Sequence, residues 1–274
     1  MQTIIFTDLD GTLLDYHTYS FEKALPALEL IRRKGIPLVV CSSKTRKEIE
    51  YYRDKIGNRH PFVTENGGGI IIPKNYFSFD LSGLSCPADK GGDCGIIALG
   101  APYADLRRAI LRLREEGLAV RGFGDMTAEE LSVLAGMSVE EALLAKERDF
   151  DEPFLFSGNC DELQKLIASV RAKGFTITHG RFFHIHGDND KGKAVSLLIE
   201  LYRREFGDIV TVAIGDRKND IPMLRQVDYP ITVQTPDGYY DLHGAVPHLI
   251  KAEGIGPEGW NSAIRDIISK VVDF

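Results

Sequence analysis

Continuous apolar runs alternate with amphipathic stretches along the first 80 residues of the chain. The runs at residues 3–7 and 38–41 are typical of strands that are buried on both faces of a sheet. Apolar positions recur at helical spacing over residues 22–33 and 45–55, and Gly35 follows the first of these stretches. Strands that alternate with helices in this way predict βαβ units in a doubly wound parallel sheet.

The pattern changes near residue 83. Residues 83–95 contain Gly, Pro, Asp and Cys, which indicates a connection between domains. Two capping boxes follow, each of which predicts the start of a short helix: Thr127 with Glu130, and Ser138 with Glu141. Further strands are expected at 96–99, 119–121, 154–156, 176–178 and 182–186, and helices at 103–116 and 161–173. This mixture predicts an α+β insert whose antiparallel sheet carries helices on one face.

The α/β pattern returns after residue 190, with helices expected at 191–206, 220–224 and 260–272 and a strand at 210–214. The sequence therefore predicts an α/β fold with a doubly wound, Rossmann-like parallel-sheet core. We expect residues 1–82 and 188–274 to form this core and residues 83–187 to form the inserted α+β domain. An insert of roughly 100 residues lies within the usual size range of a domain.

Composition narrows the class of protein. No apolar run approaches the roughly 18 residues that a membrane span requires, and the N-terminus does not have the layout of a signal peptide, so we expect a cytoplasmic protein without membrane contact. The four cysteines form no CxxC pair and are too sparse for a disulfide scaffold. A net charge of −7 without a basic stripe argues against binding of nucleic acid.

The segment Asp8-Leu9-Asp10-Gly11-Thr12 follows directly on the first apolar run. Two carboxylates two residues apart leave an extended strand on the same side, and Gly11 permits a sharp turn beyond them. Burial of two like charges is unfavourable unless a cation or a shared proton relieves their repulsion. The segment therefore indicates a metal site, a nucleophile with a neighbouring acid, or both.

Three further segments are expected at the carboxyl ends of strands or the start of a helix. Ser42 and Ser43 follow the strand at 38–41, at the sheet edge where open α/β sheets bind ligands. Lys191 stands at the start of a helix, where the helix dipole disfavours a cation unless it neutralises an anion such as phosphate. Asp216 opens the polar run that follows the strand at 210–214. Carboxylates at this edge suit Mg²⁺, which takes oxygen ligands.

The order DxDGT, Ser, Lys and GDxxND at strand ends resembles the haloacid dehalogenase superfamily of phosphohydrolases. This resemblance implies that Asp8 is the nucleophile, which forms an aspartyl-phosphate, and that Asp10 is the general acid and base. It further implies that Ser42 and Lys191 hold the phosphoryl group. These roles agree with the chemistry, because one acid can protonate a leaving alkoxide and later deprotonate water.

The same resemblance implies a Mg²⁺ cofactor. Its ligands would be Asp8, the carbonyl of Asp10, and Asp216, while Asn219 and Asp220 would support the metal-binding loop. An insert between the Ser42 and Lys191 segments implies a cap of the large α/β type, which closes over the active site and supplies specificity. Such a cap favours small soluble substrates over phosphoproteins.

Within the insert, residues 181–187 combine Arg181 with the pair His184 and His186. The two histidines lie on one face of a strand, and their spacing leaves three interpretations open. An HxH pair binds zinc when a third ligand is near, but the sequence offers none nearby. Two ordinary exposed histidines are a second interpretation. An anion site is the third, because Arg clasps carboxylates and phosphates bidentately.

Several longer segments resemble the mannosyl-3-phosphoglycerate phosphatase family: residues 42–46, 65–68, 141–154, 180–184, 190–192 and 256–260. That family hydrolyses mannosyl-3-phosphoglycerate to mannosylglycerate, a compatible solute, and uses Mg²⁺. The resemblance implies a small phosphorylated sugar acid as substrate. The substrate-binding residues that it implies are Ser43, Lys44, Glu65, Asn66, Arg181 and His184. Among these, Arg181 and Lys44 suit the anionic groups, whereas Glu65, Asn66 and His184 suit sugar hydroxyls.

Two positions stay open at this point. Trp260 suits either the apolar face of a sugar or the anchoring of the last helix in the core. The family usually has Ser-Pro where this chain has Arg217-Lys218, and we expect these two cations to face solvent.

The sequence also leaves alternatives for the function. Glucosyl-3-phosphoglycerate and other sugar phosphates are alternative substrates, and a phosphotransferase or mutase is an alternative of a different class. A non-catalytic binding protein is disfavoured because Asp8, Asp10, Lys191 and Asp216 are all present. For assembly we expect a monomer or a homodimer.

Overall fold

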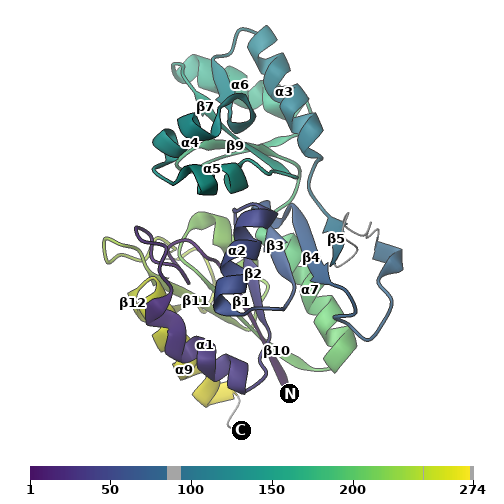
Figure 1. Ribbon diagram of the computed structural model, residues 1–274, viewed down its shortest axis with the longest axis vertical. Coiled ribbons are helices and arrows are strands. Elements are labelled where there is room, and N and C mark those ends of the chain that lie inside the picture. Colours follow the sequence, from purple (N-terminus) through teal and green to yellow (C-terminus); the bar gives the residue numbers. More distant parts are fainter. Residues whose placement is uncertain (85–93, 243, 272–274) are drawn as a thin grey trace.

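Eight strands form the larger of two β-sheets in the computed structural model, which describes residues 1–84, 94–242 and 244–271 (Figure 1). Their order is β12-β11-β10-β1-β2-β3-β4-β5. The strands from β12 to β3 are parallel, and β4 runs antiparallel to both of its neighbours, β3 and β5. The strands are β1 (Gln2–Thr7), β2 (Leu38–Cys41), β3 (Phe62–Thr64), β4 (Gly69–Pro73), β5 (Cys94–Ala98), β10 (Ile209–Gly215), β11 (Tyr229–Gln234) and β12 (Ile250–Ile255). This arrangement confirms the predicted α/β class with a parallel sheet.

Helices cover both faces of this sheet, which explains the continuous apolar strands. In β1, Ile5 packs with α1, α2 and α9 on one face, whereas Ile4 and Phe6 pack with α7 and α8 on the other. These helices are α1 (Leu25–Arg33), α2 (Arg46–Ile56), α7 (Lys191–Phe206), α8 (Ile221–Leu224) and α9 (Pro257–Val271). Short 3₁₀ turns occur at Glu22–Ala24, Glu65–Gly67, Ser82–Leu84, Phe123–Asp125 and Lys218–Asp220.

A second sheet of four antiparallel strands, in the order β6-β7-β9-β8, lies beyond the larger sheet (Figure 1). Its strands are β6 (Val120–Gly122), β7 (Asp151–Phe156), β8 (Thr176–His179) and β9 (Phe183–His186). Four helices belong to this part of the chain: α3 (Tyr103–Glu115), α4 (Ala128–Ala135), α5 (Val139–Ala145) and α6 (Cys160–Ala172). The two predicted capping boxes start α4 and α5, as expected.

Helices pack on both faces of this smaller sheet, so the prediction of helices on one face is wrong. Phe154 and Ile185 pack with α3 and α6 on one face. Leu155 and Phe182 pack with α4 and α5 on the other face. The reason is that neighbouring residues of a strand point to opposite sides, and both sides of β7 are apolar near its end.

The expected boundary at residue 83 also differs from the structure. β5 pairs with β4 in the larger sheet, from Gly69 opposite Ala98 to Pro73 opposite Cys94. The segment after residue 93 therefore returns to the larger sheet before the chain enters the smaller one. Most of the predicted connection at 83–95 lies outside the described residues.

The smaller sheet and its helices lie over the end of the larger sheet where α2 begins (Figure 1). α5 approaches α2 there, and the hydroxyl of Thr45 donates to the carbonyl of Leu144 at 2.9 Å. Within the described ranges, no helix combines the length and the apolar character that a membrane crossing requires. We refer below to residues 101–187 as the insert and to the larger sheet with its helices as the core.

Candidate active site

Two acidic segments meet at the edge of the larger sheet because β1 and β10 are adjacent and parallel. Thr7 lies opposite Ile214, so the residues that follow the two strands emerge side by side. The N–H of Asp8 donates to the carbonyl of Ile214 at 3.0 Å. Gly11 turns the chain at a φ of +77°, and a Cβ at this position would lie 2.8 Å from Asp216 Oδ2. Glycine is therefore required for this close approach.

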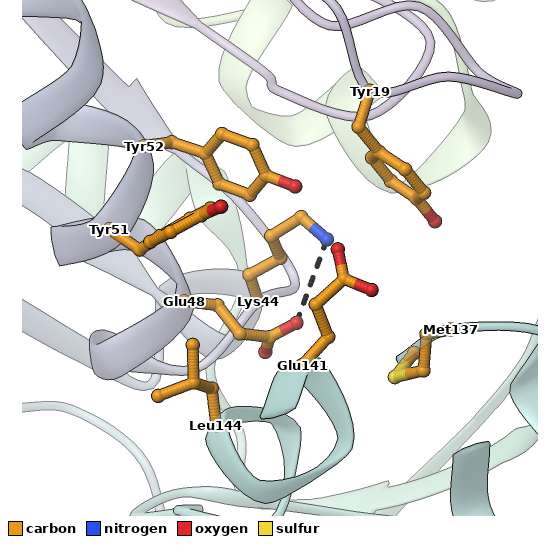
Figure 2. Close-up of a pocket in the computed structure, with 8 residues that line it drawn as sticks. All are labelled: Tyr19, Lys44, Glu48, Tyr51, Tyr52, Met137, Glu141 and Leu144. Atoms are coloured by element: carbon orange, nitrogen blue, oxygen red, sulfur yellow. Dashed lines mark ion pairs between the residues drawn. The ribbon is translucent and has the colours of Figure 1, made fainter. Parts of the chain in front are cut away.

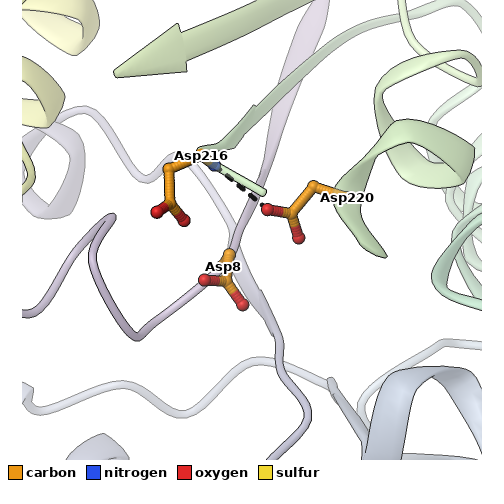
Figure 3. A group of neighbouring side chains, drawn as sticks. All are labelled: Asp8, Asp216 and Asp220. Atoms are coloured by element: carbon orange, nitrogen blue, oxygen red, sulfur yellow. Dashed lines mark hydrogen bonds between the residues drawn. The ribbon is translucent and has the colours of Figure 1, made fainter. Parts of the chain in front are cut away.

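The carboxylates of Asp8, Asp216 and Asp220 form a buried cluster (Figure 3), with one oxygen of each within 4.8 Å of the others. Lys191, which begins α7, is also fully buried. Its amino group lies 2.6 Å from Asp8 Oδ1 and 2.6 Å from Asp220 Oδ1. The second oxygen of Asp220 accepts from the N–H groups of Asp216 and Arg217, at 3.0 Å each. Asp220 therefore orders the loop and also belongs to the charged cluster.

The electrostatics of this cluster follow from burial of like charges. Burial raises the pKa of Asp8 well above its usual value, and Lys191 opposes this rise. Burial and the neighbouring Asp220 raise the pKa of Asp216 to about 7. Burial disfavours the ammonium group, but Asp220 and Asp8 outweigh this effect and raise the pKa of Lys191. The lysine therefore stays charged, and the carboxylates need still more positive charge to be ionised together.

These residues fit an oxygen-liganded divalent cation. Thr12 Oγ1 donates to Asp216 Oδ1 at 3.0 Å, whereas the buried Asp216 Oδ2 accepts no hydrogen bond. Of the ligands predicted from the sequence, Asp8 and Asp216 lie together in the cluster. The ligand predicted at Asp10 is its carbonyl, and its carboxylate pairs instead with Lys44, whose Nζ lies 3.2 Å from Oδ1. The cluster thus offers carboxylate oxygens and a buried acceptor without a donor.

A pocket lies between α2 of the core and α5 of the insert (Figure 2), and Lys44 in its lining pairs with Asp10. Lys44 Nζ lies 3.2 Å from Asp10 and 3.6 Å from Glu48, so this lysine is already paired with two carboxylates. Tyr19 has a φ of +54°, and its ring centroid lies 4.8 Å from Lys44 Nζ. A positive φ is uncommon for tyrosine and occurs where the surrounding structure holds it. The residues that line the pocket are Tyr19, Lys44, Glu48, Tyr51, Tyr52, Met137, Glu141 and Leu144.

The predicted serines lie on the loop between β2 and α2. Ser42 is buried, and its hydroxyl accepts from the N–H of Lys44 at 3.2 Å. The carbonyl of Ser43 accepts from Arg148 Nη1 of the insert at 3.2 Å. Asn66 Oδ1 accepts from Asn219 Nδ2 at 3.1 Å, which links the loop after β3 to the loop after β10. These residues thus lie on loops at the same edge of the sheet.

Both carboxylate oxygens of Glu65 accept hydrogen bonds from the backbone of the insert. Its side chain is fully buried, and its two oxygens accept from the N–H groups of Asp149 and Phe150, at 3.0 and 2.9 Å. Burial raises the pKa of Glu65 to about 7. In this structure Glu65 therefore holds the backbone at the start of β7, and its predicted contact with sugar hydroxyls stays a prediction.

Arg181 contacts the backbone of the insert, and its predicted role toward an anionic group of the substrate stays a prediction. It donates to the carbonyls of Leu134 and Ala135, at 3.0 and 2.8 Å, and so satisfies the C-terminal end of α4. His184 Nδ1 lies 2.8 Å from Asp151 Oδ2. His186 Nδ1 lies 2.9 Å from the carbonyl of Gly187. In the described parts of the chain, the metal-ligand groups of three or more comprise only the cluster around Asp8, which disfavours zinc at the histidine pair.

The two open positions are settled by their contacts. Trp260 is fully buried, and its Nε1 donates to Thr7 Oγ1 at 3.0 Å, so it anchors α9 on the core. Arg217 Nε lies 3.2 Å from Asp216 Oδ2, and its guanidinium lies over the ring of Tyr16. Lys218 is exposed. The side chain of Arg217 is still 43% exposed, so both cations face solvent, Arg217 in part.

Sequence reasoning gave no role to Arg148, Asp151 or Tyr19. Arg148 and Asp151 form a buried ion pair at 3.1 Å within the insert, and Arg148 also donates to the carbonyl of Ser43 on the core loop. A signal for them was the run of charged residues at 147–152, where a buried strand begins. For Tyr19 the sequence carried no signal, because its backbone conformation is set by the loop that follows Asp10.

The comparisons with known proteins agree with this geometry. The sequence profile of the haloacid dehalogenase-like hydrolases matches residues 5–81 and 145–237. A protein from Methanococcoides burtonii named glucosyl-3-phosphoglycerate/mannosyl-3-phosphoglycerate phosphatase is 47% identical, over 98% of each chain. A protein of the same name from Persephonella marina is 41% identical, also over 98% of each chain. A solved phosphatase of the haloalkanoate (HAD) superfamily from Bacteroides thetaiotaomicron is 18% identical, with a TM-score of 0.66 over 98% of this chain and 95% of its own.

Proposed function

Because this chain belongs to the haloacid dehalogenase-like hydrolases, we propose that it is a Mg²⁺-dependent phosphatase of glycosyl-3-phosphoglycerates. Mannosyl-3-phosphoglycerate is the first substrate we assign, and the glucosyl compound is the second. The products are the glycosylglycerate and inorganic phosphate. The observation that supports this most directly is the 47% identity, over 98% of both chains, to a protein that is named for both substrates.

The reaction we propose has two steps. In the first, a carboxylate oxygen of Asp8 attacks phosphorus, the bond from phosphorus to the glycerate oxygen breaks, and Asp10 gives its proton to the leaving alkoxide. In the second, Asp10 takes a proton from water, the water oxygen attacks phosphorus, and the bond to Asp8 breaks. One acid serves both steps, because the group that has lost its proton in the first is the base required in the second.

The core residues hold the phosphoryl group in this proposal. The ammonium of Lys191 is fixed between Asp8 and Asp220, at 2.6 Å from each, so its charge lies beside the attacking oxygen. Ser42 and Ser43 lie on the loop after β2, at the same edge of the sheet. Charge held in place before the reaction stabilises the transition state without reorganisation, and this effect is usually the largest in catalysis.

Asp8, Asp216 and the carbonyl of Asp10 would hold the Mg²⁺ ion. The ion supplies positive charge that offsets the repulsion between an anionic nucleophile and an anionic phosphate. Asp220 and Asn219 support the loop that carries Asp216, through the bonds to its backbone and to Asn66.

We propose that the leaving group lies at the pocket beside Asp10, which at about 20 Å³ has room for only part of this group in the present structure. Asp10 must reach the oxygen that leaves, so the rest of that group lies on the Asp10 side of phosphorus. Tyr19, Tyr52 and Glu141 line this space with aromatic faces and a carboxylate, which suit the apolar faces and hydroxyls of a sugar. The insert contributes Glu141, so its position over the core helps to define the pocket.

Phosphate release in the presence of Mg²⁺ tests the proposal. The substrates are mannosyl-3-phosphoglycerate, glucosyl-3-phosphoglycerate, 3-phosphoglycerate and a panel of simple sugar phosphates. We expect kcat/KM for the two glycosyl-3-phosphoglycerates to exceed that for the simple sugar phosphates at least about a hundredfold, or about 2.7 kcal/mol of transition-state binding. Comparable rates on simple sugar phosphates would remove the assigned substrate, and phosphoryl transfer to an added sugar would indicate a phosphotransferase.

Asp8→Asn tests the nucleophile. The substitution keeps the shape of the side chain and removes its nucleophilic charge, so we expect turnover to fall at least about a thousandfold while the fold is retained. Asp54→Asn is the matched control, because Asp54 is exposed and pairs with Arg59 on the surface. Retention of near wild-type turnover by Asp8→Asn would contradict the assignment.

A further inference from the structure

A buried chain of polar contacts runs from the loop after β2 into the insert. Arg148 Nη1 donates to the carbonyl of Ser43 at 3.2 Å and to Asp151 Oδ2 at 3.1 Å. His184 Nδ1 lies 2.8 Å from the same oxygen of Asp151. Arg148 also donates through Nε to the carbonyl of Ala145, at the end of α5, at 2.9 Å. The loop that carries Ser42 and Ser43 is thereby joined to β7 and β9 of the smaller sheet.

His184 lies on the face of the smaller sheet that is turned toward the core. Its neighbours Phe183 and Ile185 pack with α3 and α6 on the opposite face. Arg148 shares Asp151 with His184 and contacts the core loop. The side chain of His184 is about one-fifth exposed, and within the described residues only its Nδ1 has a hydrogen-bond partner. Its Nε2 is therefore available to a ligand between the insert and the core.

Asp151 is the residue on which this chain of contacts depends. Its side chain is almost fully buried, and among the described residues its Oδ1 accepts no hydrogen bond, so both of its side-chain partners, Arg148 and His184, lie at Oδ2. Burial raises the pKa of Asp151, but His184 and Arg148 outweigh burial and hold it below its usual value. An ionised carboxylate only accepts hydrogen bonds, so it fixes Nδ1 of His184 as the donor and sets the orientation of the ring.

We propose that Asp151 and Arg148 are positioning residues, which orient His184 toward the oxygen-rich leaving group of the substrate and tie that orientation to the Ser42–Ser43 loop. This inference rests on the proposed function. The phosphoryl group is held by residues of the core, so His184 reaches the sugar or the carboxylate part of the substrate. A phosphate ester with a small aryl leaving group has no such part and does not use His184.

Asp151→Asn is the first test, because the amide keeps the shape of the side chain and loses the charge that fixes the imidazole. We expect KM for the glycosyl-3-phosphoglycerate to rise at least tenfold with kcat changed less than threefold. For p-nitrophenyl phosphate we expect kcat/KM within twofold of wild type. Glu152→Gln is the matched control: Glu152 is the next residue of β7, is equally buried and pairs with Arg107 at 2.6 Å, but its recorded partners all lie within the insert.

A double variant separates positioning from a structural role. If Asp151 acts through His184, then Asp151→Asn adds less than twofold to the loss in His184→Gln, whereas independent effects multiply. The inference would be overturned if the losses of the two single variants in kcat/KM for the glycosyl-3-phosphoglycerate multiplied in the double variant. It would also be overturned if Asp151→Asn and Glu152→Gln lost kcat/KM equally. Should Asp151→Asn fail to fold, Arg148→Lys takes its place in the same cycle, and an unchanged KM for the glycosyl substrate in that variant is then the overturning result.

Failure of the positioning role can be distinguished from failure of the proposed function. A wild-type enzyme that hydrolyses p-nitrophenyl phosphate but neither glycosyl-3-phosphoglycerate refutes the assigned substrate, and the inference falls with it. A wild-type enzyme that hydrolyses these substrates, together with an Asp151→Asn variant whose KM is unchanged, refutes the positioning role alone.

Discussion

Lys191 is a fully buried cation whose ammonium lies 2.6 Å from Asp8 and 2.6 Å from Asp220. In Lys191→Met, two buried carboxylates face each other without their shared counter-charge. Removal of one partner from a buried ion pair costs about 3–5 kcal/mol, because it leaves uncompensated charge in the interior. We expect a loss of that order in the free energy of unfolding, measured by denaturant titration at pH 8 with a chelator, together with loss of phosphate release.

Lys193→Met is the control for this prediction. Lys193 lies two residues further along α7, is half exposed, and pairs with the exposed Asp188. Exposed ion pairs contribute about 0–1 kcal/mol, so this variant should unfold near the wild-type midpoint. Equal midpoints for both lysine variants would show that Lys191 does not neutralise the cluster.

The positions of individual site residues could be predicted where the sequence fixes them through the backbone. Asp8 and Asp216 each follow a continuous apolar strand, and adjacent parallel strands bring their ends together. The partner of Arg181 could not be predicted in this way. Its long side chain reaches the carbonyl groups at the end of α4, and that contact exists only after α4 has packed against the sheet.

At the scale of elements, Glu65 fastens the loop after β3 to the start of β7. Its pKa is raised from 4.5 to about 7 by burial, so the folded state binds this proton more tightly than the unfolded chain does. Its contribution to stability is therefore complete below about pH 4.5 and is lost as the pH rises toward about 7. We expect the difference in unfolding free energy between wild type and Glu65→Gln to fall by up to roughly 3 kcal/mol across this window.

Denaturant unfolding of both proteins at pH 5 and pH 8 measures this difference. Glu258→Gln serves as the control, since Glu258 is exposed and forms a surface pair with Lys23. Its difference from wild type should change by less than about 1 kcal/mol between the two pH values. A Glu65→Gln difference that stays constant or grows with pH would contradict the burial of a carboxyl group at this junction.

Helices and strands with strong local sequence signals could be predicted from the sequence. Strands that depend on hydrogen bonds to neighbouring strands could not. The capping boxes at Thr127 and Ser138 predicted α4 and α5 because the side-chain and backbone bonds of a cap are local. β3 has only three residues, which is too short for any periodicity, and it exists because β2 and β4 lie on either side of it. β12 is mostly exposed or half-buried, so it lacks the apolar run that marked β1.

At the scale of the whole molecule, the site joins two parts of the core that are separated in sequence by the insert. The α/β class could be predicted because buried parallel strands are continuous apolar runs. The packing of α4 and α5 between the smaller sheet and the core could not, because it depends on how the two sheets face each other. That packing brings Glu141 of α5 and Lys44 of the core to one pocket (Figure 2).

The same separation predicts how the proposed Mg²⁺ ion would affect the stability of the whole chain. Asp8 follows the first strand, and Asp216 follows β10, beyond the insert. An ion held by both cross-links these parts in the folded state alone. At a free Mg²⁺ concentration of about 100 times its Kd, such binding adds about 2.7 kcal/mol to the free energy of unfolding, which calorimetry should register as a rise in Tm of roughly 5–10 °C.

Asp216→Asn should remove this Mg²⁺-dependent rise. Without the ion, this variant should be at least as stable as wild type, because it relieves the repulsion from Asp220 that helps to raise the pKa of Asp216 to about 7. Asp188→Asn should keep the full rise, since Asp188 is exposed and lies on the surface next to α7. If Asp216→Asn kept the rise, Mg²⁺ would have to stabilise the chain elsewhere, and the repulsion within the carboxylate cluster would be offset by Lys191 and Arg217 without a metal ion.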